Sequence, residues 1–291
     1  MAINTKLPED SWSIPNPLPK PSPKAKAPAP KATAPVKRKS PRPKSPRKKK
    51  KGQQPTRKFW IGLALLCGII LLVMYVEYFV EKPKPVWPEG HTIYGVDVSH
   101  YQKDVDWQKV RENEIAFAFV KATEGVTLKD KHFERNWQGA GASGIIKGAY
   151  HFYLPYLDPK KQARNFISSV KLSRGDLPPV LDVEVRGRKP VEQLRKDIKV
   201  WLDEVENAYG VRPIIYTGYN FYESHLAGHF DGYHLWIAHY KVPKLNMEKS
   251  NNRKLAFWQH TDVGAVEGIE GTVDCNVFYG SMRDLREVCV K

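Results

Sequence analysis

Four acidic side chains stand out because each lies in an otherwise apolar segment, where a carboxylate is expensive to bury. They are Asp97, Asp182, Glu184 and Asp274. Asp182 and Glu184 are two residues apart, so in an extended strand both point to the same side, with Cα atoms ~6.6 Å apart. Carboxyl groups held together between apolar walls raise at least one pKa, which puts an acid beside a base. Cleavage of a glycosidic bond needs such a pair.

The alternative is a structural role, in which these acids cap strands or pair with Lys121, Arg186 and Arg188. That interpretation suits one acid better than four in comparable positions. The histidines lack the spacing of a metal site such as H-E-x-x-H, so we expect no catalytic metal. The chain also lacks a G-x-S-x-G elbow, a glycine-rich phosphate loop and a C-x-x-C pair, which argues against esterase, nucleotide and redox chemistry and for no cofactor.

Aromatic side chains accompany the acids and offer flat faces on which sugar rings stack. The candidates for substrate binding are Tyr150, Phe152, Tyr216, Trp236 and Trp258. Packing in the core is the alternative for about half of them, since aromatic residues are common in any core.

Apolar runs that alternate with amphipathic stretches must position these side chains. The runs predict eight strands, near 93–99, 115–123, 145–153, 178–185, 211–219, 233–240, 255–261 and 272–278. Helices are predicted near 104–113, 130–142, 159–171 and 190–208. Strand–helix repeats of this kind predict an α/β fold, a TIM-like barrel with a parallel sheet and its chemistry at the carboxyl ends of the strands.

The N-terminal part of the chain has a different composition. Residues 1–58 contain 17 of the 47 Lys and Arg residues and only two acids, so we expect a disordered, Pro/Lys-rich tail. Residues 59–80 are apolar over a length that predicts an uncleaved transmembrane helix. The basic block 47–51 places the tail in the cytoplasm and the C-terminal domain in a periplasm or outside the cell.

The rest of the chain divides into a short stalk, 81–91, and a domain, 92–291. From residue 59 onward there are 30 basic and 29 acidic residues, so a nucleic-acid-binding domain is not expected. The tail itself has two interpretations, contact with anionic lipids or a dedicated protein or nucleic-acid partner. The oligomeric state is left open.

Residues of about 93–285 resemble glycoside hydrolase family 25, the N-acetylmuramidase lysozymes. The resemblance rests on GVDVSHYQ (95–102), FVKATEG (119–125), GAYHFY (148–153), LDVEV (181–185), IIYTGY (214–219), LWIAHY (235–240), FWQHT (257–261) and VDCNVF (273–278), in the family's order. It implies a modified barrel of eight strands with about five helices. It also implies hydrolysis of the β-1,4 bond between N-acetylmuramic acid and N-acetylglucosamine in peptidoglycan.

The resemblance assigns roles to particular residues. Glu184 corresponds to the general acid and Asp182 to its partner carboxylate, which acts on the substrate's 2-acetamido group if the reaction is substrate-assisted. Asp97 and Asp274 correspond to the remaining acidic pair, and Tyr216 to a tyrosine near the reacting sugar. Gln259, within FWQHT, joins the substrate-binding candidates. Retention and inversion both remain open.

Two departures from the family pattern carry alternatives. The basic loop Arg186–Arg188 could bind carboxylates of peptidoglycan or be a solvated loop, and Cys275 could pair with Cys289 or stay free. Two other functions also remain open, a catalytically silent tether or scaffold that binds peptidoglycan and a chitinase-like N-acetylhexosaminidase.

Overall fold

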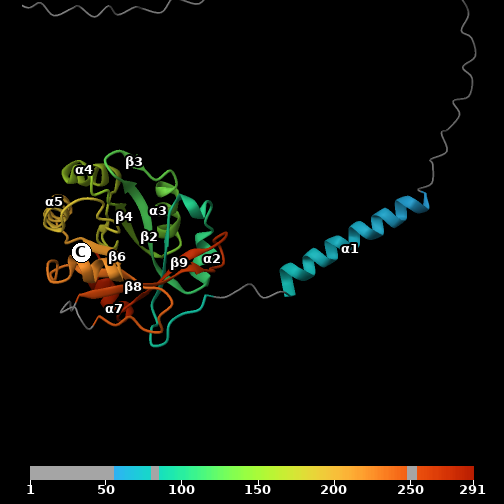
Figure 1. The fold of residues 1–291 in the computed structure, drawn as a ribbon. Coiled ribbons are helices and arrows are strands. Elements are labelled where there is room, and N and C mark those ends of the chain that lie inside the picture. The colour runs from blue at the N-terminus through green and yellow to red at the C-terminus, as the bar shows by residue number, and fades with distance from the viewer. Residues whose placement is uncertain (1–55, 80–84, 248–253) are drawn as a thin grey trace, which may run out of the picture. The chain divides into compact units, whose positions relative to one another are not determined.

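The computed structural model describes residues 56–79, 85–247 and 254–291, and for 76–79 it describes the backbone alone. The predictions for residues 1–55, and for the first residues of the stalk, therefore lie outside the described residues. The described residues form two parts, an apolar helix and a barrel (Figure 1).

The apolar helix α1 runs from Arg57 to Phe79, where a transmembrane segment was predicted over 59–80. At 1.5 Å per residue its 23 residues extend over ~35 Å, which suffices for the hydrocarbon core of a bilayer. Its window Arg57–Tyr75 has a mean hydropathy of 2.2 and no buried side chain. By length and composition α1 can cross a membrane.

The second part is a closed barrel, as predicted. Its strands are β1 (Tyr94–Val98), β2 (Ile115–Glu124), β3 (Leu128–Lys129), β4 (Ile146–Phe152), β5 (Val180–Asp182), β6 (Ile214–Gly218), β7 (His234–Ala238), β8 (Leu255–Gly264) and β9 (Val273–Phe278). The order is β1-β9-β8-β7-β6-β5-β4-β2, and pairing of β1 with β2 closes the ring. The unpredicted β3 is a two-residue strand that pairs only with the end of β2.

The expected parallel sheet holds for the ring except at β9, which runs antiparallel to both of its neighbours, β1 and β8, while the short β3 outside the ring is antiparallel to β2. Only residues 265–272 connect β8 to β9, and they contain no helix. A parallel neighbour needs a crossover of a dozen or more residues. The short connection therefore forces a hairpin, which brings the first residues of β9 to the barrel end where the parallel strands finish.

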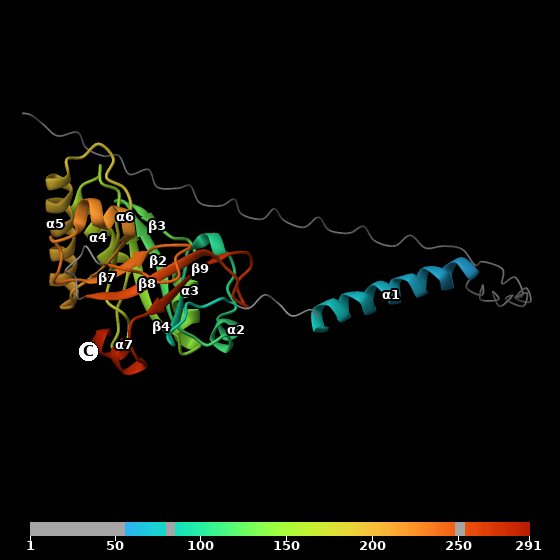
Figure 2. The same ribbon diagram turned by 60° about the horizontal axis from the view of Figure 1, so that its bottom comes forward.

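The helices pack on the outside of the ring. Five have six or more residues in the described part of the barrel, namely α2 (Trp107–Glu112), α3 (Phe133–Ala142), α4 (Pro159–Ser169), α5 (Val191–Tyr209) and α7 (Met282–Val288). Helices α4 and α5 lie side by side (Figure 2). The Asp158 side chain accepts from the Lys161 N–H and Pro159 occupies the first turn, which fixes where α4 begins.

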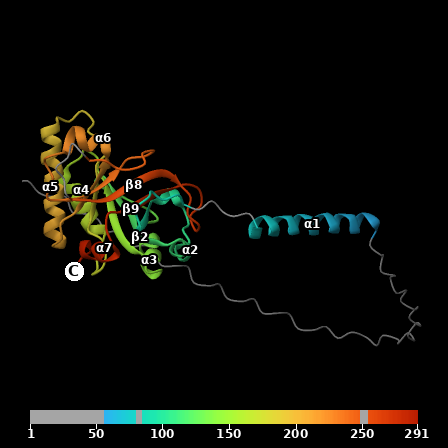
Figure 3. The ribbon, with the colours of Figure 1, turned by 90° about the horizontal axis from the view of Figure 1, so that it is seen from below.

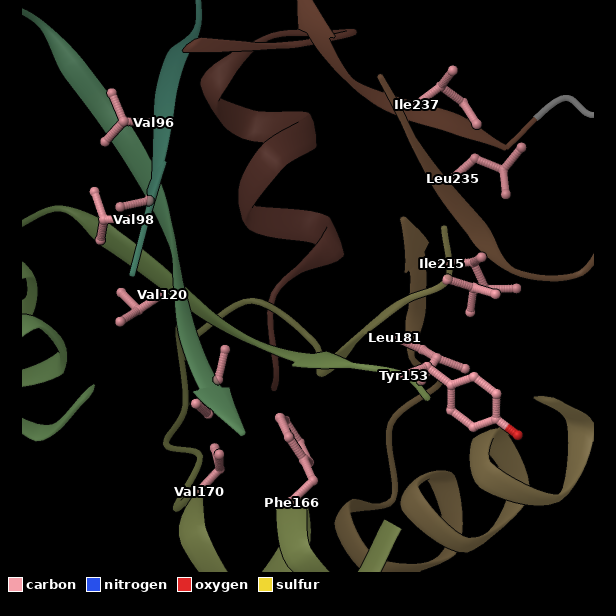
Figure 4. Close-up of a cluster of buried hydrophobic side chains, with 14 of the residues drawn as sticks. Val96, Val98, Val120, Tyr153, Phe166, Val170, Leu181, Ile215, Leu235 and Ile237 are labelled. Carbon is pink, nitrogen blue, oxygen red and sulfur yellow. The ribbon is translucent and has the colours of Figure 1, made fainter. Parts of the chain in front are cut away.

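Side chains alternate between two cores. The outer core lies between strands and helices, and Figure 4 shows part of it, including Val96, Val120 and Phe166. The inner core fills the barrel with aromatic rings, among them Phe117 and Phe119. A Cβ on Gly95 would lie 2.3 Å from the Phe117 ring, so glycine leaves the room that this ring occupies.

Helix α7 closes one end of the barrel (Figure 3). Its Leu285 packs in the inner core with Phe278, the last residue of the antiparallel β9. This is the end where the parallel strands begin, so the opposite end is the open one.

No helix lies in the described connection from β8 to β9, and part of the expected stalk packs on the outer side of β1 and β8. Trp87 stacks on Tyr94 of β1, with ring centroids 4.3 Å apart, and its edge meets His260 of β8. Contact with the barrel thus begins five residues before the domain boundary expected at residue 92.

Candidate active site

All four predicted carboxylates line one cavity of about 200 Å³ at the open end of the barrel. Asp97 in β1 lies directly opposite Asp274 in the antiparallel β9. Asp182 is the last residue of β5, and Glu184 follows two residues later, beyond the strand. Because four acids from three strands meet in one cavity, they do not act as separate caps of individual strands.

Asp97 and Asp274 form the first carboxyl pair, in which the two side chains hydrogen-bond each other. Because two carboxylates repel, this proximity favours a pair that carries one negative charge over a pair that carries two. Burial, reinforced by the charge of Asp274, raises the pKa of Asp97 well above its ordinary value. Burial raises the pKa of Asp274 to about 6.

Asp182 and Glu184 form the second pair, also joined by a side-chain hydrogen bond. Asp182 is 4% exposed, and burial together with the charge of Glu184 raises its pKa well above the ordinary range. Glu184 lies exposed at the mouth, where partial desolvation still raises its pKa. Glu184 is therefore the member of this pair that a ligand in the cavity can reach.

A network of amides and hydroxyls surrounds Asp97. Gln259 Nε2 and Asn276 Nδ2 each donate to Asp97 Oδ2 over 2.8 Å. Gln259 Oε1 accepts from the hydroxyls of Tyr216, at 2.8 Å, and Tyr240. The indole of Trp236 donates to Asn276 Oδ1 over 2.7 Å.

Five of the six predicted substrate-binding residues line the cavity. They are Tyr150, Phe152, Tyr216, Trp236 and Gln259. Trp236 is 1% exposed and stacks on Phe119, so most of its face is already used inside the barrel.

Trp258 is the exception and corrects the prediction. It is fully buried in the outer core, where its indole donates to the His239 carbonyl. Successive residues of a strand point to opposite faces, so the neighbouring Gln259 points into the barrel and Trp258 points out.

Several cavity residues were not predicted as a site. They are Val98, Ser99, Tyr101, Gln102 and Lys121. Lys121 is 8% exposed, pairs with Glu124 over 2.7 Å and lowers the pKa values of Asp182 and Glu184. The signal for Tyr101 and Gln102 was available, because they follow Asp97 just past the end of β1, and such loops build the mouth of a barrel.

Of the two departures noted in the sequence, the structure decides the one that concerns the cysteines. Cys275 and Cys289 are both free and buried, and they belong to the outer and the inner core respectively, so they do not form a disulfide. In the basic loop, Arg186 donates to the Lys189 carbonyl over 2.8 Å. Within the described residues, no group of three or more His, Cys, Asp or Glu side chains could hold a metal ion.

A closed barrel with carboxyl pairs at its open end has the equipment of a glycoside hydrolase. Residues 96–269 match the model of glycosyl hydrolases family 25. The chain therefore belongs to this family and is a glycoside hydrolase, as predicted.

Similar proteins place the chain within that family. It is 44% identical over 223 residues to the uncharacterized protein YegX of Escherichia coli (strain K12), covering 73% of this chain and 80% of that one. It is 31% identical over 203 residues to lysozyme M1 of Streptomyces globisporus, covering 65% and 68%. The structure of a family 25 glycosyl hydrolase from Bacillus anthracis aligns with a TM-score of 0.66 at 32% identity, covering 72% of this chain and 99% of that one.

Proposed function

We propose that the protein is a lysozyme, an N-acetylmuramidase that hydrolyses the β-1,4 bond between N-acetylmuramic acid and N-acetylglucosamine in peptidoglycan. The observation that carries the proposal is the Asp182–Glu184 pair, a buried and an accessible carboxyl that line the same cavity at the mouth of the barrel and both have a raised pKa. Lysozyme M1 of S. globisporus and the autolytic lysozyme of Clostridium acetobutylicum, at 31% and 32% identity, support this substrate.

In the proposed reaction Glu184 is the general acid. It transfers its proton to the glycosidic oxygen as the bond to the sugar carbon breaks and the bonding electrons move to that oxygen. The carboxylates of Asp182 and Asp97 stabilise the positive charge that develops on the sugar. Water then adds to the sugar carbon and returns a proton to Glu184, so the enzyme is regenerated.

The location of the reaction follows from α1 and the basic tail. We propose that α1 spans a membrane once, with the basic tail in the cytoplasm beside anionic lipids and the barrel in a periplasm or outside the cell. Peptidoglycan is an extracytoplasmic polymer, so this orientation brings the cavity to its substrate. The enzyme would then remodel or lyse cell wall near the membrane.

The experiment is mass spectrometry of soluble products after the full chain, in detergent, is incubated with purified peptidoglycan. We expect muropeptides that end in reducing N-acetylmuramic acid. The Glu184→Gln variant keeps the shape of the side chain but removes the acid, so its turnover should fall ~10²–10⁴-fold. Because Glu184 is exposed, the melting temperature of the Glu184→Gln variant should stay close to that of the unchanged chain.

Two results would replace the proposal. Release of reducing ends from chitin but not from peptidoglycan would make the protein a chitinase-like N-acetylhexosaminidase. Binding of both chains to sedimented peptidoglycan without any release would make it a catalytically silent tether.

A further inference from the structure

The inner end of the cavity holds an amide arrangement whose orientation can be deduced from donors alone. The Trp236 indole N–H can only donate, so the atom of Asn276 that faces it must be the carbonyl oxygen. The amide nitrogen of Asn276 is then forced towards Asp97 Oδ2. No rotation of the Asn276 amide group escapes this assignment, since it would set an N–H against the indole N–H.

The structure orients Gln259 in the same sense. Its Oε1 receives two tyrosine hydroxyls, from Tyr216 and Tyr240, and its Nε2 donates to Asp97 Oδ2. The Asp97 oxygen therefore faces two N–H groups. A proton on Oδ2 would collide with both, which leaves Oδ1 as the only oxygen of Asp97 that can carry one.

We propose that Asn276 and Gln259 are positioning residues that hold the Asp97–Asp274 pair at one negative charge and confine its single proton to the line between Asp97 Oδ1 and Asp274. Hydrogen bonds to an ionised acceptor are about twice as strong as those to a neutral one, so two fixed N–H donors favour the charged pair. The inference rests on the proposed function, because the retained charge stabilises the positive sugar of that reaction.

Other groups around Asp97 act against a second negative charge. The acidic groups around it are Asp274 on β9, Tyr150 on β4, Asp182 on β5, Tyr216 on β6 and Tyr240 after β7. Lys121 on β2 lines the same cavity and acts in the opposite sense, and Cys275 of β9 points to the outer core. Burial and the charge of Asp274 oppose full ionisation, whereas the two amides oppose full protonation. The Asp97–Asp274 pair is thus kept between full ionisation, with two negative charges, and full protonation, with none.

The test compares Gln259→Met, Gln259→Glu and the control Gln162→Met in the full chain in detergent. Methionine keeps the length of the side chain and removes the donor, so the acid limb of the kcat/KM profile on peptidoglycan should move upward by about one pH unit. A glutamic acid at 259 can donate to Asp97 only while protonated, so activity should persist at acid pH and be lost as that group ionises. Gln162 is an equally buried amide in α4 that makes hydrogen bonds to the backbone of Leu154. Its variant should therefore leave the acid and alkaline limbs of the kcat/KM profile unchanged.

A second measurement separates this inference from the proposed function. In the chain labelled with 4-¹³C aspartate, the Asp97 signal is assigned by its loss in Asp97→Asn, and its titration needs no substrate. An upward shift in Gln259→Met supports the inference even if peptidoglycan is not cleaved. An Asp97 titration that is the same in the unchanged chain and in Gln259→Met would overturn it.

Discussion

Burial of ionised carboxyl groups in the cavity destabilises the barrel. Asp182 is almost fully buried, and its Oδ1 has no hydrogen-bond partner. Its pKa is raised in the folded chain, so the folded state binds more protons than the unfolded state above pH 3.8, the ordinary value. This part of the stability is therefore complete at lower pH and is lost as pH rises towards the folded pKa. An ion kept at such a cost is typical of a catalytic site.

Asp182→Asn should therefore make the protein more stable and less active. At pH 7.5 we expect the free energy of unfolding to rise by about 0.5–2 kcal/mol. The gain should shrink as pH falls towards 4, because the native aspartic acid is then protonated. Denaturant unfolding at several pH values checks this, with Asp203→Asn on the exposed face of α5 as the control. An asparagine variant that is less stable at pH 7.5 would contradict the expectation.

At the scale of elements, the eight main strands could be predicted because each is a short apolar run. The direction of β9 was harder to predict, since it depends on the absence of a crossover helix between β8 and β9. The four acids were found because residue types that are costly to bury are conspicuous in apolar strands. Trp258 was wrongly predicted to bind substrate because successive strand residues point to opposite faces of the sheet. Its aromatic character does not reveal which face it occupies. The roles of Gln259 and Asn276 emerge only from contacts between β1, β8 and β9.

The segment before β1 also acts as an element of the barrel, and Trp87 is its test. Trp87→Ala removes the ring that stacks on Tyr94 of β1 and meets His260 of β8. Because Trp87 is half-buried, we expect a loss of about 1–3 kcal/mol in the free energy of unfolding, less than for a fully buried tryptophan. The neighbouring Val86 is 85% exposed, so Val86→Ala should change stability by less than about 0.5 kcal/mol. If Trp87→Ala changes the free energy of unfolding as little as Val86→Ala does, the segment is a free linker.

For the molecule as a whole, charge and hydropathy divide along the chain. The tail of residues 1–58 carries 17 basic residues against two acids, whereas the rest of the chain is nearly neutral. Between the tail and the barrel lies α1, with large apolar side chains such as Leu65, Leu66 and Ile69 exposed. Apolar side chains of this kind are the ones that lipid would cover in the proposed membrane span.

The membrane anchor is tested by charging that helix. Leu66 and Ile70 are four residues apart, hence on one face of α1, and an arginine at a helix centre costs about 2.5–3.5 kcal/mol on insertion. The unchanged chain should stay with membranes after alkaline carbonate extraction, whereas Leu66→Arg with Ile70→Arg should move to the soluble fraction. The control places the same two charges on exposed apolar positions of the barrel, with Leu128→Arg and Val263→Arg, and should remain with membranes. If the doubly charged helix stays in the membrane fraction as fully as the control, α1 does not anchor the chain, and the barrel must be held at the membrane by other contacts.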